Sequence, residues 1–478
     1  MAKKENNPEV FIKNKKVLLM GLGILGGGVA TSRWLVKHGA KLTITDLKKR
    51  KDLQSSLLKL KPYLAKIKLV LGRHREKDFK ENDIIIANPG VIVHKNHFLK
   101  IAKKEKKPIE NDLSLFFKFA NSPIIAVTGT RGKTTVASWL SQLLSQKYQA
   151  FLGGNTPENP VLSFLDSLKP ENPVVLELSS LQLELLNNAK PKIAIITNLY
   201  IDHLNRYGTM EKYAQIKSNI FKNQDASDYL VLNYQNQWTK FFLSLKPKGK
   251  IYFVSSTALP LTKNGVYLKD NKVYLQENKK QVFLFPLGNF PEKWGRHNVE
   301  NLMFVVLAAK IFGLSLQEIR KVFNLLTPVK FRQEVVAETK NLTIINDSAA
   351  TSPEATIAAL ERFKNKNLYL ISGGTDKKLS FNGLAKAIKK NISNGHLILL
   401  DGSATKKLIK ELKKEKYLQE YFLYDSLEEC FNQVLFLAKE KQSKSIVLFS
   451  PASASFEKFK NEFDRGEKFN QLVKQSVK

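Results

Sequence analysis

The run "IIAVTGTRGKTTVASWL", residues 124–140, carries the residue types and spacing that indicate chemistry most directly. An apolar, strand-like stretch breaks at Gly129, and a helix-like stretch begins after Thr134. Because glycine has no Cβ, Gly129 and Gly132 let the backbone curl tightly and direct N–H groups at an anion, and the following helix adds its positive end. Lys133 would then lie along the terminal phosphates, and the Thr134 hydroxyl would ligate Mg²⁺. The run predicts a phosphate-binding loop with ATP as its ligand.

This loop is a variant of the general P-loop. The general motif has four residues between its first glycine and its Gly-Lys pair, whereas two residues separate Gly129 from Gly132. An ordinary glycine turn before a helix would explain the glycines alone, but the order of strand, glycines, lysine and two threonines favours phosphate binding. We assign to the ATP site Gly129, Thr130, Gly132, Lys133, Thr134 and Thr135.

A second glycine-rich loop lies near the N-terminus. Gly21, Gly23 and Gly26 form G-x-G-x-x-G after the apolar run "VLLM", and Asp46 ends the next strand-like run, "KLTITD". This is the dinucleotide-binding fingerprint, which taken alone favours a nicotinamide oxidoreductase. A role in packing is the alternative for these glycines. Because a phosphate loop with a lysine follows in the same chain, a domain that binds a nucleotide diphosphate beside an ATPase accounts for both loops.

Three further polar residues are candidates for a metal site or for catalysis. Glu177 ends an apolar run, and because a buried unpaired carboxylate is costly, a Mg²⁺ ligand is favoured over a solvent-facing side chain. His203 is one of 7 histidines, and a lone histidine is more often structural or exposed. Composition alone would place Lys217 on the surface of so basic a chain.

The composition indicates a globular protein with little sign of a specialised partner. The net charge is +34, from 77 Lys and Arg against 43 Asp and Glu, and the lysines are spread as in solvated helix faces. No arginine-aromatic patch is present to read bases, so we expect no nucleic-acid partner and keep a nucleic-acid ATPase only as an alternative. Cys430 is the one cysteine, which excludes an intrachain disulfide. No apolar run approaches ~18 residues, so we expect no membrane span and a cytoplasmic protein. We also expect a monomer.

The order of strand-like and helix-like runs predicts an α/β protein with three domains. A chain of 478 residues is too long for a single core, since cores stop growing near ~250–300 residues. Residues 16–46 have a β-α-β pattern, residues 124–200 alternate as in a parallel sheet, and short runs between 228 and 290 predict a small β-rich subdomain. We place the domains at residues 1–111, 112–328 and 329–478.

A series of motifs in one order resembles the Mur ligase family over essentially all 478 residues. The motifs are "VTGTRGKTT", "LELSSLQLE", "NLYIDHLNRYG", "YAQIKSNIF", "GRHNVEN", "FRQEVV", "NDSAATSPEATIAAL", "ISGGTDKK" and "FSPASASFEKFKNEFDRGEKF". The resemblance implies an N-terminal Rossmann-like domain for a UDP-sugar and a central P-loop ATPase-like parallel sheet with a small β subdomain. The third domain is implied to be Rossmann-like and to bind the incoming amino acid.

The resemblance also implies a reaction. In this family ATP activates a carboxylate as an acyl phosphate, and the amine of an amino acid then attacks to form an amide. The motifs are most similar to those of the members that add D-glutamate to UDP-N-acetylmuramoyl-L-alanine in peptidoglycan precursor synthesis, with ATP and Mg²⁺ as cofactors.

Individual roles follow from the same resemblance. The implied catalytic residues are Lys133, His203 and Lys217, and the implied metal site contains Thr134, Glu177, His203 and Lys217, with Lys217 carbamylated so that its ammonium becomes an anion. The nucleotide base, phosphates and ribose are implied to contact Asn298, Arg332 and Asp347. The implied UDP-sugar site contains Leu25, Asp46, Leu47, Asn88, Pro89, Gly90, Asn155 and His203. The implied amino-acid site contains Thr351, Lys377, Ser455 and Phe456.

Three departures from the family pattern concern substrate binding. Ala349 stands where the family usually has a lysine, at the amino-acid end of the site. A related ligase that uses another amino acid or acceptor, including L-glutamate or folyl-glutamate substrates, therefore stays open as an alternative. Glu462 stands where an aromatic residue is expected. Leu25 and Leu47 replace small hydroxyl residues, so the uridine nucleotide would be held through backbone groups or by Lys48.

Overall fold

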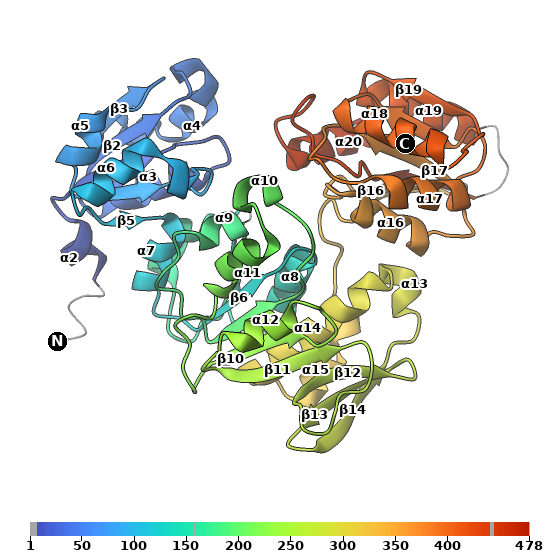
Figure 1. Cartoon of the computed structure of the whole chain (residues 1–478), viewed down its shortest axis with the longest axis horizontal. Helices are drawn as coiled ribbons and strands as arrows, with labels where there is room; N and C mark the ends of the chain where they lie inside the picture. Colours follow the sequence, from blue (N-terminus) through green and yellow to red (C-terminus); the bar gives the residue numbers. More distant parts are fainter. Residues whose placement is uncertain (1–6, 156–157, 440–443, 478) are drawn as a thin grey trace. The chain divides into compact units, whose positions relative to one another are not determined.

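The computed structural model describes residues 7–155, 158–439 and 444–477 (Figure 1). Its helices and strands form three sheet-containing α/β domains, which confirms the predicted fold class. The chain divides into two compact units. The first unit comprises Met1–Pro286 with Glu300–Leu326 and holds the N-terminal and central sheets, and the second comprises Leu287–Val299 with Thr327–Lys478 and holds the C-terminal sheet. The predicted domain boundaries stay a prediction.

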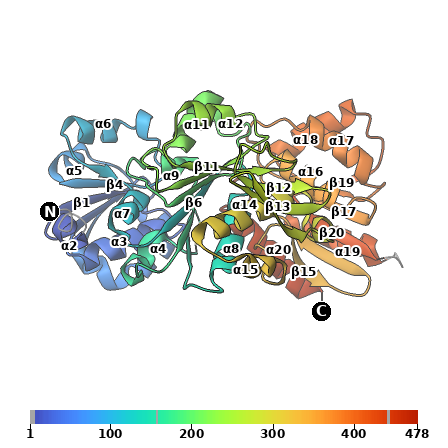
Figure 2. The ribbon, with the colours of Figure 1, turned by 90° about the horizontal axis from the view of Figure 1, so that it is seen from below.

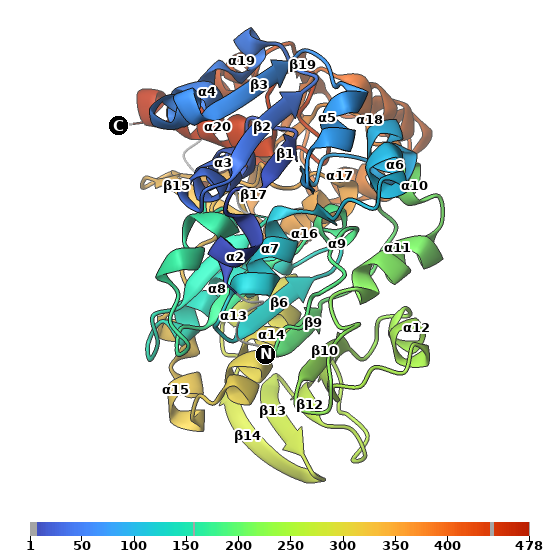
Figure 3. The ribbon, with the colours of Figure 1, turned by 90° about the vertical axis from the view of Figure 1, so that its left-hand side faces the viewer.

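The N-terminal sheet is parallel, with the order β3-β2-β1-β4-β5. Strand β1 carries apolar residues at every position after the first, as expected of a strand covered on both faces. Val17 and Leu19 belong to one buried cluster, whereas Leu18 and Met20 belong to another. Figure 3 shows α3 and α4 on one side of this sheet and α5 and α6 on the other. The elements are α2 (Pro8–Ile12), β1 (Lys16–Met20), α3 (Gly27–Lys37), β2 (Lys41–Asp46), α4 (Gln54–Lys59), β3 (Ile67–Leu71), α5 (Glu76–Glu81), β4 (Ile84–Ala87), α6 (His97–Lys104) and β5 (Ile109–Glu110).

The central sheet has the order β14-β13-β12-β11-β10-β9-β6-β8-β7. Its strands are parallel from β7 to β12, and β12, β13 and β14 are antiparallel. The β-rich segment predicted between residues 228 and 290 therefore continues the edge of the central sheet. Figure 2 shows α11 and α12 above this sheet and α8, α14 and α15 below it. The strands are β6 (Ile124–Thr128), β7 (Phe151–Gly154), β8 (Val174–Glu177), β9 (Ile193–Ile196), β10 (Tyr229–Asn233), β11 (Lys250–Ser255), β12 (Gly265–Lys269), β13 (Lys272–Glu277) and β14 (Lys280–Pro286).

Two of the helices around the central sheet begin at or beside candidate site residues, α8 at Lys133 and α10 directly after His203. The helices around this sheet are α7 (Asp112–Phe119), α8 (Lys133–Leu144), α9 (Ser180–Leu183), α10 (Leu204–Tyr207), α11 (Met210–Ser218), α12 (Thr239–Ser244), α14 (His297–Phe312) and α15 (Leu316–Arg320). Helix α14 begins in the second unit and continues into the first. Among the described helices, none combines the length and apolar character that crossing a bilayer requires.

The second unit contains a six-stranded sheet with the order β15-β16-β20-β17-β18-β19. Only its edge pair, β15 with β16, is antiparallel. The elements are α13 (Phe290–Trp294), β15 (Glu334–Glu338), β16 (Leu342–Asn346), α16 (Pro353–Arg362), β17 (Asn367–Gly373), α17 (Asn382–Asn391), β18 (Leu397–Leu400), α18 (Ser403–Lys414), β19 (Tyr421–Tyr424), α19 (Leu427–Lys439), β20 (Ser445–Phe449) and α20 (Glu462–Ser476). Cys430 is buried on α19, which excludes a reactive surface thiol.

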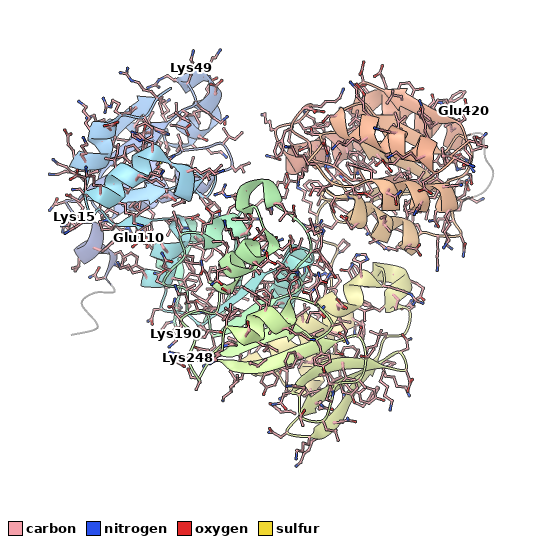
Figure 4. All side chains as sticks on the ribbon, in the orientation of Figure 1. Lys15, Lys49, Glu110, Lys190, Lys248 and Glu420 are labelled. Atoms are coloured by element: carbon pink, nitrogen blue, oxygen red, sulfur yellow. The ribbon has the colours of Figure 1, made fainter. Side chains whose placement is uncertain are left out.

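Lysines across the chain lie on its surface. Lys15, Lys49, Lys190 and Lys248 are exposed (Figure 4). Long basic side chains of this kind keep their charge in water, as predicted for solvated faces. The buried lysine described below is therefore an exception that needs a local explanation.

Candidate active site

The predicted phosphate loop joins the buried strand β6 to helix α8. Gly129 has φ +145° and Gly132 has φ +81°, conformations that L side chains rarely adopt. A Cβ on Gly129 would lie 2.0 Å from Thr197 Oγ1, and a Cβ on Gly132 would lie 2.3 Å from Asn301 Oδ1. Both space and backbone geometry therefore require glycine at these two positions.

The loop is fixed from the side by the segment that follows β9. The Arg131 N–H donates to Asn198 Oδ1 at 2.8 Å, and the Thr197 hydroxyl donates to the Arg131 carbonyl at 2.6 Å. The first helical bond of α8 runs from Val136 N–H to the Gly132 carbonyl. The N–H groups of residues 133–135 precede that bond and form the positive end of the helix, which is a ready anion site.

Lys133 and Lys217 approach this loop from different helices. The Lys133 side-chain nitrogen lies 3.2 Å from the Thr130 carbonyl oxygen. The Lys217 side chain, from α11, is fully buried and donates to the Gly129 carbonyl at 2.9 Å and to Thr128 Oγ1 at 3.2 Å. Composition alone would place Lys217 on the surface, and that alternative is wrong.

The surroundings of Lys217 disfavour its charged form. Burial holds the pKa of its amine well below the usual 10.5, and the positive charge of Lys133 lowers it further. The carboxylates of Asp202 and Glu177 oppose this shift. The ring of Tyr213 lies 4.8 Å from the amine nitrogen. These surroundings favour the neutral amine of Lys217, the form that reacts with electrophiles.

Glu177 and Asn155 meet at the ends of neighbouring strands. The Glu177 carboxylate is buried and accepts a hydrogen bond from the Asn155 side-chain amide at 3.2 Å, while the Asn155 N–H donates to the Glu177 carbonyl at 2.8 Å. The solvent-facing alternative for Glu177 is wrong. Because β7, β8 and β6 are adjacent and parallel, both residues lie at the carboxyl ends of the strands, on the same side of the sheet as the phosphate loop.

His203 lies at the start of α10 in a left-handed conformation, with φ 55°. Its N–H donates to Asp202 Oδ1 at 2.9 Å, and Asp202 Oδ2 lies 3.3 Å from Arg131 Nη1 in the phosphate loop. The carboxylate of Asp202 thus joins His203 to that loop. Sequence reasoning missed both Asp202 and Arg131, although an acid directly before a candidate histidine was a usable signal.

The N-terminal glycine loop is supported by two of the predicted residues. Asp46 accepts hydrogen bonds from the N–H groups of Gly23 at 3.1 Å and Lys48 at 2.8 Å. The Asn88 amide donates to the Gly21 carbonyl at 3.3 Å and accepts from the Gly90 N–H at 3.0 Å, so it also closes the Asn88-Pro89-Gly90 turn. The two leucines predicted for the UDP-sugar site are exposed, Leu25 at 53% and Leu47 at 66%.

In the second unit, Asp347 follows β16 and is buried. Its carboxylate accepts from the Gln333 N–H at 3.1 Å and from the Ser450 hydroxyl at 2.7 Å. Burial raises its pKa to about 7 in spite of these bonds and of the positive charges on Arg332 and Arg362. Asn298, at the start of α14, donates to the Trp294 carbonyl at 2.7 Å.

The predicted amino-acid residues lie on loops of the same unit. Ser455 is buried, and its hydroxyl has no hydrogen-bond partner within the described part of the chain. Residues 375 and 454 form an isolated bridge, which brings the Lys377 loop against the Ser455 loop. Phe456 is exposed, and Thr351 lies just before α16. The buried guanidinium of Arg465 fixes this loop by donating to the carbonyls of residues 453 and 454 and to the Ser348 carbonyl, a role that sequence reasoning missed.

Comparison with known proteins assigns the chain to a family. A Mur ligase MurD-like N-terminal domain matches residues 15–110, a Mur ligase middle domain matches residues 127–309, and a Mur ligase glutamate ligase domain matches residues 331–453. The chain is 40% identical to the UDP-N-acetylmuramoylalanine–D-glutamate ligase of Borreliella afzelii (strain PKo), over 97% of this chain and 98% of that relative. The chain belongs to the Mur ligase family. The ligase of the same name from Borreliella burgdorferi (strain ATCC 35210 / DSM 4680 / CIP 102532 / B31) is also 40% identical to this Mur ligase, over 97% of this chain and 98% of that one.

A solved structure shares the fold of this Mur ligase. The UDP-N-acetylmuramate-alanine ligase MurC of Thermotoga maritima superposes with a TM-score of 0.59 at 21% identity, and the match covers 97% of this chain and 100% of that one. The family membership confirms the resemblance that the motifs indicate. The roles of the individual residues stay predictions.

Within the described residues of this Mur ligase, no group of three or more His, Cys, Asp or Glu side chains is arranged to hold a metal ion. A hard cation at the phosphate loop would need oxygen donors of other kinds. A threonine hydroxyl, a modified lysine and the phosphates of a bound nucleotide are donors of this kind. The residues at the loop therefore fit Mg²⁺ only if such groups supply the oxygen ligands that the Glu177 carboxylate alone does not provide.

Proposed function

We propose that this Mur ligase uses ATP to join D-glutamate to the carboxylate of UDP-N-acetylmuramoyl-L-alanine through an acyl phosphate. The observation that carries the proposal is the gathering of Lys133, Lys217 and Glu177 around one phosphate loop. The names of the two Borreliella relatives supply the substrates. A cytoplasmic location and a monomeric state are part of the proposal, and the buried free cysteine is typical of a protein from a reducing compartment.

The electrostatics of the loop suit phosphoryl transfer to a carboxylate. A carboxylate and ATP repel each other, so positive groups must neutralise them before an in-line attack. Lys133 and the N-terminal end of α8 supply this field from fixed positions. Mg²⁺, when bound by Thr134, Glu177, His203 and Lys217, would neutralise further phosphate charge.

The lowered pKa of Lys217 supports its carbamylation, because the neutral amine is the form that reacts with CO₂. The amine nitrogen attacks the carbon of CO₂, an N–C bond forms and one proton leaves, so a buried amine becomes a buried anion. That anion would face the opposite charge of Lys133 and a metal ion. A cation-binding role thus explains a buried lysine that has little other reason to be buried.

The two chemical steps follow from the same arrangement. An oxygen of the substrate carboxylate attacks the γ-phosphorus, and the bond to ADP breaks. The amine of D-glutamate then attacks the acyl carbon, phosphate leaves and an amide remains. We assign Asn155 and His203 to the carboxylate end of the UDP-sugar, and the turn at Asn88, Pro89 and Gly90 with Leu25, Asp46 and Leu47 to its nucleotide.

The second unit is assigned to the nucleotide and the amino acid. Asn298, Arg332 and Asp347 would contact the ATP base, phosphates and ribose, and Thr351, Lys377, Ser455 and Phe456 would contact D-glutamate. The buried Ser455 hydroxyl supports the second assignment, because a buried polar group without a partner is costly until a ligand pairs with it.

Phosphate release from ATP tests the proposal. With UDP-N-acetylmuramoyl-L-alanine present, D-glutamate, L-glutamate, L-alanine and diaminopimelate are compared as acceptors. Phosphate release that requires both D-glutamate and the UDP-sugar supports the proposal. Phosphate release with another amino acid, an alternative that Ala349 keeps open, would mean that the enzyme is specific for that amino acid. Phosphate release that does not depend on the UDP-sugar would contradict the proposed function.

A further inference from the structure

Arg206 links three segments of the first unit that lie far apart in the sequence. It lies on α10, three residues after His203. Its guanidinium donates to both carboxylate oxygens of Glu184, with the Nη2 to Oε2 distance at 2.8 Å. The same Nη2 donates to the Val91 carbonyl at 2.9 Å. The Arg206 side chain is 10% exposed and the Glu184 side chain is 6% exposed, so the pair is largely removed from water.

The Val91 carbonyl belongs to the turn assigned to the nucleotide of the UDP-sugar. Val91 follows Gly90, and its N–H donates to the Asn88 carbonyl at 2.9 Å. The carbonyl of Val91 therefore moves with that turn. The Arg206 guanidinium, which donates to this carbonyl, therefore connects the turn at the carboxyl end of β4 to α10 of the central domain.

Glu184 is a well-anchored partner for Arg206. It directly follows α9, which is anchored by two side-chain amides. The Asn111 amide donates to the Gln182 carbonyl at 3.1 Å, and the Asn219 amide donates to the Leu183 carbonyl at 2.9 Å. The next residue, Leu185, packs against the apolar cluster between the N-terminal sheet and α5 and α6. The carboxylate thus presents a fixed point from which the guanidinium reaches the turn.

We infer that Arg206 is a positioning residue that sets the nucleotide-sugar turn at a fixed distance from His203. The inference rests on the proposed function, since it assigns the turn to the UDP-sugar and His203 to the reacting end of the same substrate. A substrate held at both ends must match the spacing between the two sites, because catalysis depends on the placement of the reacting atoms. Arg206 controls that spacing without touching the substrate.

Arginine is required for this link because of its geometry. Its planar fork donates two parallel bonds to a carboxylate and keeps a further N–H for the carbonyl, whereas a lysine presents a single rotatable ammonium. Arg206→Lys keeps the positive charge opposite Glu184 but loses the fixed connection to Val91. Glu184→Gln keeps the arginine and removes the charge that orients it.

The test compares Arg206→Lys and Glu184→Gln with a matched control in the full-length enzyme. Arg75→Lys is the control, because Arg75 makes the same forked pair with Asp78 inside the N-terminal domain. We expect Arg206→Lys to raise the KM for UDP-N-acetylmuramoyl-L-alanine by about 10- to 100-fold, the effect of losing a charge-assisted hydrogen bond. The KM for ATP should stay within about twofold. Glu184→Gln should show the same split, and Arg75→Lys should leave both KM values unchanged.

Two results would overturn the inference. One is an equal loss toward ATP and the UDP-sugar in the Arg206 and Glu184 variants, which indicates general damage to the fold. The other is a lowered melting temperature with both KM values intact, which indicates a purely structural ion pair. If Arg206→Lys does not fold, Glu184→Gln alone decides between these outcomes. Failure of the proposed function is distinct, since the unsubstituted enzyme would then show no ATP turnover dependent on the UDP-sugar.

Discussion

The side-chain nitrogen of Lys217 lies 2.9 Å from the carbonyl oxygen of Gly129, the first glycine of the phosphate loop. A second lysine, Lys133, begins the helix at the other end of that loop. Burial and the positive charge of Lys133 both lower the pKa of Lys217, whereas Lys133 supplies that positive charge. The two residues are therefore suited to different tasks, Lys133 as a fixed cation and Lys217 as a group that can be modified.

Replacing Lys217 tests its conversion to an anion. We expect Lys217→Ala to lower the ligation rate on the order of 10²-fold, since the group proposed to bind the metal is removed. Formate or acetate should restore part of the rate by occupying the position of the carbamate. Lys212→Ala is the control, because Lys212 is exposed on the same helix. Full activity in Lys217→Ala, or a loss that no carboxylate repairs, contradicts the assignment, and phosphate release measures both.

Lys133 should matter for the transition state of phosphoryl transfer more than for binding. Removing one fixed donor from a site of developing charge costs about 3–4 kcal/mol, so Lys133→Ala should lower kcat on the order of 10²–10³-fold. Single-turnover formation of ADP with saturating substrates is the measurement. A variant that keeps the parent rate would remove Lys133 from the mechanism, and circular dichroism with a thermal melt confirms that the variant is folded.

The sequence is most informative where the chemistry is local. The phosphate loop and its lysine lie in one short run, and Glu177 is recognisable as an acid at the end of an apolar strand. Lys217 is the opposite case, because its burial depends on Gly129, which lies 88 residues away in the sequence. Only the family motif indicated its role.

Ion pairs and hydrogen bonds between distant segments were not predictable from local patterns. Arg131 and Asp202 lie 71 residues apart, and Arg465 and Ser348 lie 117 residues apart. An arginine in a chain with 77 basic residues carries no sign of which carboxylate or carbonyl it will meet. Such partners are set by which strands become neighbours in the sheet, a property of the whole fold.

Gly132 is predicted to be essential for ATP binding because of its backbone. Alanine at this position would hold a strained φ of +81° and would place its Cβ 2.3 Å from Asn301 Oδ1. Strain of this kind costs about 1–3 kcal/mol, and relief of the clash would displace the loop, so the ATP Kd should rise about 10-fold or more. Gly27→Ala is the control, since a Cβ there meets nothing within 4 Å. Equal ATP affinity for both variants by isothermal titration calorimetry would show that the loop tolerates the change.

The buried carboxyl of Asp347 should make the stability of the second unit depend on pH. Its pKa is raised from 3.8 to about 7, chiefly by burial. As pH rises from about 4 to about 7, the unfolded chain releases this proton and the folded protein retains it, so this group lowers the free energy of unfolding across that range. Above the folded pKa its contribution no longer changes. The shift sets an upper bound on the order of 4 kcal/mol for the total effect.

Asp347→Asn removes the titration and should flatten this part of the pH dependence. Relative to the parent, the variant should gain stability steadily between about pH 4 and about pH 7 and no further above it. Urea denaturation at several pH values, followed by circular dichroism, measures the difference. Asp425→Asn is the control in the same unit, because the Asp425 side chain is 86% exposed. Parallel pH profiles for the parent and Asp347→Asn would mean that the folded protein tolerates the charged carboxylate, with Arg332 and Arg362 neutralising it.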